Sequence, residues 1–312
     1  MENTNQKFYI GLDSGGTKCD LIIIDKNLKI LFSKSYKALH YSVYGAEIIS
    51  KKLSEYILSS IRSLNNNIAN CSGICIGLAG ARESQDKSKL RQTFSRELHY
   101  KKINIETDTI TGLYGAFEGN DGVILISGTG SVLLGKSYGK IYRVGGWGRI
   151  IGDYGSGYSI GREALKEVVK EYDLSDMKKK AGLLSVKIRE VFKLNKENIV
   201  RKVFHENFEI QKVAPLVIEC AERKDKASLR IVNDAVEGLL YHIQTFLKIA
   251  KRKKPIDLVF IGSIVENNNI LSRKLKKEIN RNFKKKINIV LKKNSSAYGA
   301  ALLAQKGYSI KT

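Results

Sequence analysis

The stretch that decides the fold is Phe8-Tyr-Ile-Gly-Leu-Asp-Ser-Gly-Gly-Thr-Lys18, followed by the apolar run Leu21–Ile24. The aromatic and branched residues up to Leu12 favour a strand, and Gly15-Gly16 permits backbone angles that are closed to other residues, so strand, tight turn and strand are predicted. The turn combines an acid, two glycines, a hydroxyl and a lysine, a set that can hold a phosphate. On its own, the same pattern also fits a plain hairpin turn.

Length and composition limit the kind of protein to which this stretch belongs. The chain has 312 residues, enough for two medium domains, and its 43% hydrophobic and 27% charged residues are typical of a soluble globular protein. It has no apolar run of about 18 residues, and residues 1–7 lack the apolar core of a signal peptide. We therefore expect a cytoplasmic protein.

The cysteines and the charge further limit the kinds of protein that this chain could be. The four cysteines are few, and the spacing of Cys71 and Cys75 has no matching second pair, so we predict neither a disulfide framework nor a metal or iron–sulfur site at the cysteines. The net charge of +23 is spread over lysine runs such as 178–180, 251–254 and 284–286, without interleaved aromatic residues. These runs indicate solvated faces, and we expect no nucleic-acid or membrane partner.

Strands and helices alternate in the first third of the chain. The expected strands are 8–12, 18–25, 28–36, 73–77 and 103–107, and the expected helices are 44–64, 86–99 and 109–117. The short connections between the first three strands predict an antiparallel meander. The later strand–helix alternation predicts parallel pairing with right-handed crossovers, with Asp108 just past the last strand.

The segment Gly122–Gly135 repeats the opening design of strand, turn of glycines and hydroxyls, and strand. This echo suggests a duplicated α/β architecture whose halves face each other across a cleft. Residues 144–163 hold seven glycines and the only tryptophan. Because aromatic residues are costly in a loose linker and Ser156 is placed to cap the next helix, we predict a structured loop that lines a site.

The remainder predicts the domain organisation. Residues 176–250 read as helical throughout, followed by a strand at 256–262, a loop at 263–269, a helix at 270–284, a strand at 287–291 and a helix at 296–306. We expect an N-terminal α/β domain over 1–116 and a larger C-terminal α/β domain over 117–295, with a helical insertion at about 176–250. The last helix, about 296–312, is expected to pack back on the first domain.

Together these turns resemble a known layout. The turn at Asp13–Lys18, Asp108, the turn at Gly128–Ser131 and Gly262-Ser263 occur in the order found in sugar kinases, actin and Hsp70-type chaperones. Three motifs are more specific: Ile126–Ser131, Gly145–Gly148 and Gly152–Gly157. They resemble the N-acetylglucosamine kinase branch of the BadF/BadG/BcrA/BcrD family. The resemblance implies two ribonuclease H-like (actin/hexokinase-type) α/β domains flanking a nucleotide and sugar cleft.

The resemblance also implies roles for the residues of the nucleotide end, with ATP and Mg²⁺ as cofactors. Asp13 is anionic and suits Mg²⁺, bound through water, rather than phosphate. Asp108 matches the general base that accepts the proton of a sugar 6-hydroxyl, although a plain helix N-cap is the alternative. The remaining nucleotide-binding residues implied are Gly15, Gly16, Thr17, Lys18, Gly128, Thr129 and Gly130 for the phosphates, and Gly262 and Ser263 for the adenosine.

At the sugar end, the resemblance implies that Gly146, Trp147 and Asp153 face the substrate, because an aromatic ring beside a carboxylate suits a hexose. Trp147 could instead be plain core. His40 stands where relatives carry an asparagine that contacts the sugar, and it could equally be an inconsequential surface histidine. Ser263 replaces the second glycine of the adenosine turn.

These residues predict an ATP-dependent kinase that phosphorylates the 6-hydroxyl of N-acetylglucosamine or a close relative, such as glucosamine or N-acetylmuramic acid, as in cell-wall recycling. The family resemblance implies a homodimer. One alternative is an ATPase that activates a 2-hydroxyacyl-CoA dehydratase, but the second half has only Cys220, so the cysteine pattern for a bridging cluster is missing. The other is a non-catalytic sugar sensor, against which Asp108 and both phosphate turns argue.

Overall fold

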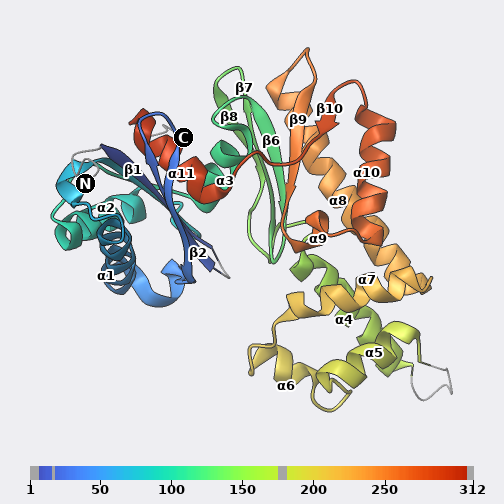
Figure 1. Ribbon diagram of the computed structural model, residues 1–312. Helices are drawn as coiled ribbons and strands as arrows, with labels where there is room; N and C mark the ends of the chain where they lie inside the picture. Colours follow the sequence, from blue (N-terminus) through green and yellow to red (C-terminus); the bar gives the residue numbers. More distant parts are fainter. Residues whose placement is uncertain (1–6, 16–17, 175–180, 308–312) are drawn as a thin grey trace. The chain divides into compact units, whose positions relative to one another are not determined.

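The computed structural model describes residues 7–15, 18–174 and 181–307 (Figure 1). The chain divides into two compact units: unit 1 comprises Met1–Gly122 and Leu291–Thr312, and unit 2 comprises Val123–Val290. The expected boundaries, at 116/117 and 295/296, differ from these by a few residues. The chain leaves unit 1 once and returns to it for its last helix.

Unit 1 is a five-stranded sheet with helices. Strand β1 pairs antiparallel with β2 and parallel with β4, and the sheet order is β3-β2-β1-β4-β5. The meander and the parallel crossovers expected from the sequence are therefore confirmed. Its elements are β1 Phe8–Ser14, β2 Lys18–Asp25, β3 Ile30–Lys37, α1 Tyr41–Arg62, β4 Cys71–Leu78, α2 Ser84–Leu98, β5 Ile103–Glu106, α3 Asp108–Phe117 and α11 Ser296–Lys306.

Helix α11 packs directly on the sheet of unit 1 because small residues meet on both sides. A Cβ at Gly11 of β1 would lie 2.1 Å from the carbonyl oxygen of Ala297 and 2.2 Å from the amide nitrogen of Ala301. No side chain fits in this space, so backbone lies against backbone. The glycine in β1 and the alanines of the last helix thus fix how the C-terminal segment returns to the first sheet (Figure 1).

Unit 2 repeats this design. Its sheet order is β10-β9-β6-β7-β8, which is the order of unit 1 with β6 in the place of β1 and β9 in the place of β4. The duplication predicted from the two glycine turns is confirmed. The elements are β6 Gly122–Ser127, β7 Ser131–Ser137, β8 Lys140–Gly145, α4 Gly157–Asp173, α5 Leu183–Phe192, α6 Ile199–Phe204, α7 Ala214–Glu222, α8 Lys226–Ala250, β9 Ile256–Ile261, α9 Ser263–Glu266, α10 Ile270–Phe283 and β10 Ile287–Ile289.

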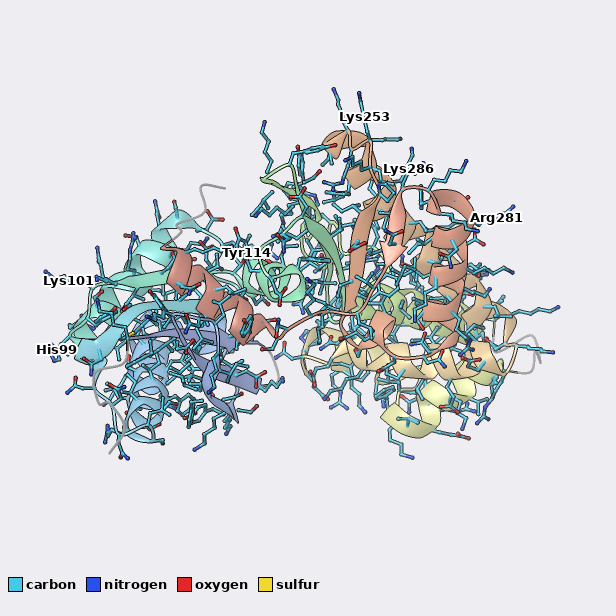
Figure 2. All side chains as sticks on the ribbon, turned by 45° about the horizontal axis from the view of Figure 1, so that its top comes forward. His99, Lys101, Tyr114, Lys253, Arg281 and Lys286 are labelled. Carbon is cyan, nitrogen blue, oxygen red and sulfur yellow. The ribbon has the colours of Figure 1, made fainter. Side chains whose placement is uncertain are left out.

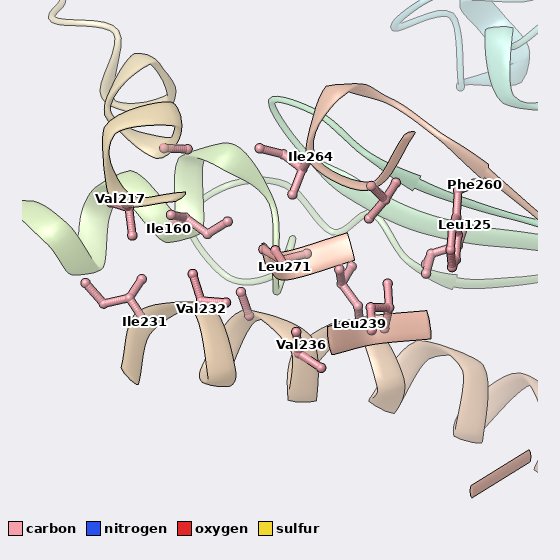
Figure 3. Close-up of a cluster of buried hydrophobic side chains, with 14 of the residues drawn as sticks. Leu125, Ile160, Val217, Ile231, Val232, Val236, Leu239, Phe260, Ile264 and Leu271 are labelled. Atoms are coloured by element: carbon pink, nitrogen blue, oxygen red, sulfur yellow. The ribbon is translucent and has the colours of Figure 1, made fainter. Parts of the chain in front are cut away.

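The core of unit 2 lies between its sheet and the long helix α8. Ile231, Val232 and Leu239 on α8 are buried, as is Leu125 on β6 and Leu271 on α10 (Figure 3). The four-residue spacing of apolar residues in the sequence placed one continuous face of α8 in this core. Burial of each such side chain contributes about 1.5–3 kcal/mol to folding.

Two sequence-based expectations need correction. Residues 263–266, expected as loop, form the short helix α9, whose first turn is closed by hydrogen bonds from Val265 N and Glu266 N to the carbonyl of Gly262. The region 176–250, expected to be helical throughout, is broken by turns, one of them at Lys193 with φ +53°. The expected lysine run 178–180 lies outside the described residues.

The other two lysine runs are exposed. Figure 2 shows Lys253 and Lys286 pointing outward from unit 2, and the neighbouring lysines of both runs are exposed as well. A backbone hydrogen bond of 3.0 Å from Ile256 N to Lys286 O brings the two runs side by side. Within the described part of the chain, none of the helices combines the length and the apolar character needed to cross a membrane.

Candidate active site

In unit 1, the predicted metal residue Asp13 is held by a threonine that the sequence did not single out. Thr111 Oγ1, on α3, donates a hydrogen bond of 2.7 Å to Asp13 Oδ1 at the end of β1. Gly77 lies opposite Asp13 in the parallel β1–β4 pair, and a Cβ there would come 2.8 Å from Asp13 Oδ1 and 2.7 Å from Thr111 Cγ2. The ends of β1 and β4 and the first turn of α3 therefore form one closely packed group.

The environment of Asp13 suits a cation. Burial chiefly raises the pKa of Asp13, to about 7; the charges of Asp108 and Asp20 add to this, and the hydrogen bond from Thr111 opposes it. A bound cation would offset the cost of burying the charged carboxylate and the repulsion from the neighbouring acids. No cluster of three or more acidic, histidine or cysteine side chains within 7–15, 18–174 and 181–307 could hold a metal, but Mg²⁺ commonly uses one or two carboxylates plus waters and substrate phosphates. The donor set fits that pattern.

Asp108 is not the cap of its helix. It is the first residue of α3, and the cap is Thr107, whose side chain accepts a hydrogen bond from the amide of Ile110. The Asp108 carboxylate is half-buried, and its Oδ1 accepts the Thr109 amide at 2.9 Å. The N-cap alternative for Asp108 is therefore wrong. The carboxylates of Asp13 and Asp108 lie at one edge of the sheet, close enough for the charge of Asp108 to raise the pKa of Asp13.

The first turn and His40 belong to the same edge of unit 1. The turn is closed by a hydrogen bond of 3.1 Å from Gly15 N to Lys18 O, and exposed Lys18 Nζ pairs with Asp20 Oδ2 at 2.6 Å. Ser14 Oγ donates 2.9 Å to the carbonyl of Leu39, which places half-buried His40, at the start of α1, next to the turn. Gly16 and Thr17 lie outside the described residues.

In unit 2, two hydroxyls tie the second turn to the glycine-rich loop. Ser127 Oγ donates 2.8 Å to the carbonyl of Gly155, and Ser131 Oγ donates 2.7 Å to the carbonyl of Tyr154. The start of α4 is joined to the same turn, because Gly157 N donates 2.7 Å to Gly128 O and Tyr158 N donates 3.2 Å to Thr129 O. The segment is thus a structured loop, and Ser156 caps α4 as predicted, accepting the Ser159 amide at 3.1 Å.

Three other predicted residues of unit 2, Asp153, Gly262 and Ser263, lie at or beside that turn. Asp153, 8% exposed, lies against it, since a Cβ at Gly130 would be 2.7 Å from Asp153 Oδ2. A Cβ at Gly262 would be 2.4 Å from the carbonyl oxygen of Ser127, so the predicted adenosine turn, followed by Ser263, adjoins the predicted phosphate turn. A short helix, α9, begins at Ser263.

Gly146 and Trp147 follow β8 in the same unit. Trp147 is 75% exposed, so the alternative that it is plain core is wrong. Gly146 is buried against Arg143, whose guanidinium donates to the Gly146 carbonyl at 3.3 Å. The turn therefore exposes the ring of Trp147, and the hydrogen bond from Arg143 holds the backbone beside it.

Beneath this turn lies His242 of α8, another residue that the sequence did not single out. It is 1% exposed, and neither ring nitrogen has a hydrogen-bond partner among the residues that the structure describes. A Cβ at Gly145 would lie 2.3 Å from His242 Nε2. Only the tertiary fold brings residues 145 and 242 together, so the sequence offered no signal for this contact; for Thr111, the position one helical turn after Asp108 was a usable signal.

Comparison with known proteins first defines the fold. The solved structure of a Chromobacterium violaceum protein, provisionally described as an N-acetylglucosamine kinase, matches 96% of this chain and 99% of its own with a TM-score of 0.74, at 21% sequence identity. The two repeated α/β units are of the ribonuclease H-like, actin/hexokinase type, as expected from the sequence.

Sequence comparison then gives the family. Residues 10–304 match the model of the BadF/BadG/BcrA/BcrD ATPase family, and the chain belongs to that family. The N-acetylmuramic acid/N-acetylglucosamine kinase of Clostridium acetobutylicum is 32% identical over 96% of this chain and 98% of its own. The N-acetyl-D-glucosamine kinase of Dictyostelium discoideum is 30% identical over 96% of this chain and 98% of its own.

Proposed function

We propose that this chain is an ATP-dependent amino-sugar kinase, which transfers the γ-phosphoryl group of Mg-ATP to the 6-hydroxyl of N-acetylglucosamine or a close relative, with glucosamine and N-acetylmuramic acid as the nearest alternatives. The observation that carries the proposal is the pair of carboxylates at one sheet edge of unit 1, with Asp13 held by Thr111 and Asp108 not used as a helix cap. The sugar kinases among its relatives, similar over nearly their whole length, support the same reaction.

Phosphoryl transfer requires positioning more than covalent chemistry from the protein. We assign Asp108 as the general base that accepts the proton of the attacking hydroxyl. Asp13 would hold Mg²⁺ through water, and the ion would neutralise charge on the phosphate oxygens. Lys18 is suited to bind phosphate because its ion pair with Asp20 is exposed at the lysine and contributes little to stability.

Unit 2 would contribute the second phosphate turn, Gly128–Gly130, with the adjoining N-terminus of α4, whose amide groups and helix dipole favour anions. Gly262 and Ser263 would meet the adenosine. Trp147 offers the apolar face of a sugar an exposed ring, and Asp153 offers an acceptor for hydroxyl groups. His40 of unit 1 is the proposed contact that differs from the asparagine of relatives, and it bears on which amino sugar is used.

The activator alternative has no support from the cysteines. Cys71, Cys75 and Cys220 are buried, and burial raises the pKa of Cys71 to about 11 and that of Cys75 well above the usual range. Buried thiols of this kind behave as small core side chains. We further propose a homodimer, which size measurement in solution tests.

A coupled assay of ADP release tests the function. The chain with Mg-ATP is offered N-acetylglucosamine, glucosamine, N-acetylmuramic acid, N-acetylmannosamine or glucose. We expect ADP release to depend on an amino sugar and to rank N-acetylglucosamine or a close relative first. Equal ADP release with and without every sugar would contradict the kinase function and favour a simple ATPase.

A further inference from the structure

Thr111 makes two contacts with the pair of acids in unit 1. Its Oγ1 lies 2.7 Å from Asp13 Oδ1 and 2.9 Å from the main-chain carbonyl oxygen of Asp108. Its side chain is completely buried. One hydroxyl on α3 therefore touches the carboxylate of one acid and the backbone of the other, although residues 13 and 111 are far apart in the sequence.

The hydroxyl has one proton to donate and three acceptors within 3.5 Å, namely Asp13 Oδ1, the carbonyl of Asp108 and, most distant at 3.5 Å, the carbonyl of Thr107. When Asp13 is ionised, its charge makes it the strongest acceptor, because charge-assisted hydrogen bonds are shorter and stronger than neutral ones. The proton then points to Asp13 Oδ1 and engages that oxygen. The orientation of the carboxylate is thereby set by α3, whose first residue is Asp108.

Gly77 of β4 leaves room for the contact between Asp13 and Thr111. Gly77 has no side chain, and the space a Cβ would need is filled by Thr111 Oγ1 and Asp13 Oδ1, each 2.8 Å from it. The Thr111 methyl group, 2.7 Å from the same point, closes the remaining side. Asp13, Thr111 and the backbone of Gly77 are therefore in close contact, and a side chain at position 77 would disturb the hydrogen bond.

We propose that Thr111 is the positioning residue of the phosphoryl-transfer site, which fixes the Asp13 carboxylate relative to Asp108 so that Asp13 receives Mg²⁺ in the productive orientation. This inference rests on the proposed function for its role in catalysis. In this proposal Thr111 touches neither the substrate nor the metal, and it acts through Asp13. A loss of the hydroxyl should therefore weaken the coupling between Mg²⁺ and nucleotide without changing the affinity for the sugar.

The test compares Thr111→Val, which keeps the shape and removes the hydroxyl, with Thr111→Ser, which keeps the hydroxyl. Thr109→Val is the matched control, because Thr109 is a buried threonine of the same helix whose Oγ1 lies 2.8 Å from Thr107 Oγ1 rather than from an acid. Calorimetry gives the affinity for ADP with Mg²⁺ and with EDTA, and the ratio of the two measures the coupling without turnover.

We expect Thr111→Val to reduce that ratio about tenfold or more, as the loss of a hydrogen bond to a charged group predicts. Thr111→Ser should stay within about threefold of the wild type, and Thr109→Val should match the wild type. In the ADP-release assay, Thr111→Val should lower kcat and raise the Mg²⁺ concentration for half-maximal rate while leaving the KM for the sugar unchanged.

An unchanged ratio in Thr111→Val overturns the inference, as does an equal loss in Thr109→Val, which would show a general effect on α3. If Thr111→Val does not fold, Thr111→Ala replaces it with the same expectations. Failure of the proposed function looks different: the wild type would release no ADP in response to any sugar, and the calorimetric ratio would still decide the role of Thr111.

Discussion

Replacement of His242 by leucine should remove a specific sensitivity of unit 2 to acid. His242 is 1% exposed, and within the described part of the chain both ring nitrogens lack hydrogen-bond partners, so its charged form is strongly disfavoured in the folded chain. Burial lowers the pKa of His242 from 6.5 to about 4. The unfolded chain therefore binds a proton at a higher pH than the folded chain does.

The sign and size of the effect follow from this difference. Well above pH 6.5 the ring is neutral in both states, so proton binding makes no difference to stability. As pH falls towards 4, the unfolded state gains the proton before the folded state does, so the folded state loses stability. A shift from 6.5 to about 4 corresponds to about 3 kcal/mol at about 1.36 kcal/mol for each unit. Leucine at this position has no proton to bind.

Hydrogen exchange of the α8 amides, measured between about pH 4 and pH 7, reports the opening of unit 2 in wild type and variant. On going from pH 7 to pH 4, the free energy of unfolding of His242→Leu should rise by about 3 kcal/mol relative to that of the wild type. Any cost of the leucine's shape against Gly145 is independent of pH and cancels. Leu239→Met, a buried change on the same helix without a titrating group, is the control and should follow the wild type. Parallel profiles for wild type and His242→Leu would refute the reasoning.

Two glycine replacements test the close approaches in the two units. Gly11→Ala should destabilise unit 1 by several kcal/mol, since the new Cβ would lie 2.1 Å from Ala297 O; thermal unfolding measures it, and a melting temperature equal to the wild type would contradict the packing of α11. Gly130→Ala should displace Asp153, because its Cβ would lie 2.7 Å from Asp153 Oδ2. We expect a raised KM for sugar or ATP with little change in stability, and unaltered kinetics would separate Asp153 from the site.

Much of the fold followed from the sequence because it depends on local patterns. The glycine turn after β1 and its repeat after β6 predicted the duplication, and both sheets have the same strand order. Apolar residues recur every fourth position along α8, at Ile231, Ala235, Leu239 and Ile243, and this local spacing is enough to give the helix one buried face. The short helix α9 was missed because the turn Gly262–Asn269 reads as loop until the Gly262 carbonyl accepts amides from 265 and 266.

The site was predictable in part, and the limit has a physical cause. Acids and glycine turns at strand ends could be recognised one at a time, as Asp13, Asp108 and Gly128 were. The pairing of Thr111 with Asp13, and the position of His242 beneath Gly145, arise where distant segments pack. The sequence places Thr111 one helical turn after Asp108, but it does not show that Thr111 meets Asp13. Exposure of Trp147 was likewise decided by the fold, since the composition of its loop allowed both a buried and an exposed ring.

The most direct test of the central claim is the identity of the phosphorylated product. Phosphorus NMR follows the chain with Mg-ATP and N-acetylglucosamine, and compares it with Asp108→Asn, which keeps the size of the side chain and removes the base. We predict a sugar 6-phosphate signal that grows with ADP in the wild type and falls by at least about a hundredfold in rate in the variant. Inorganic phosphate as the only new signal, or an equal rate of sugar phosphate formation in Asp108→Asn, would contradict the claim.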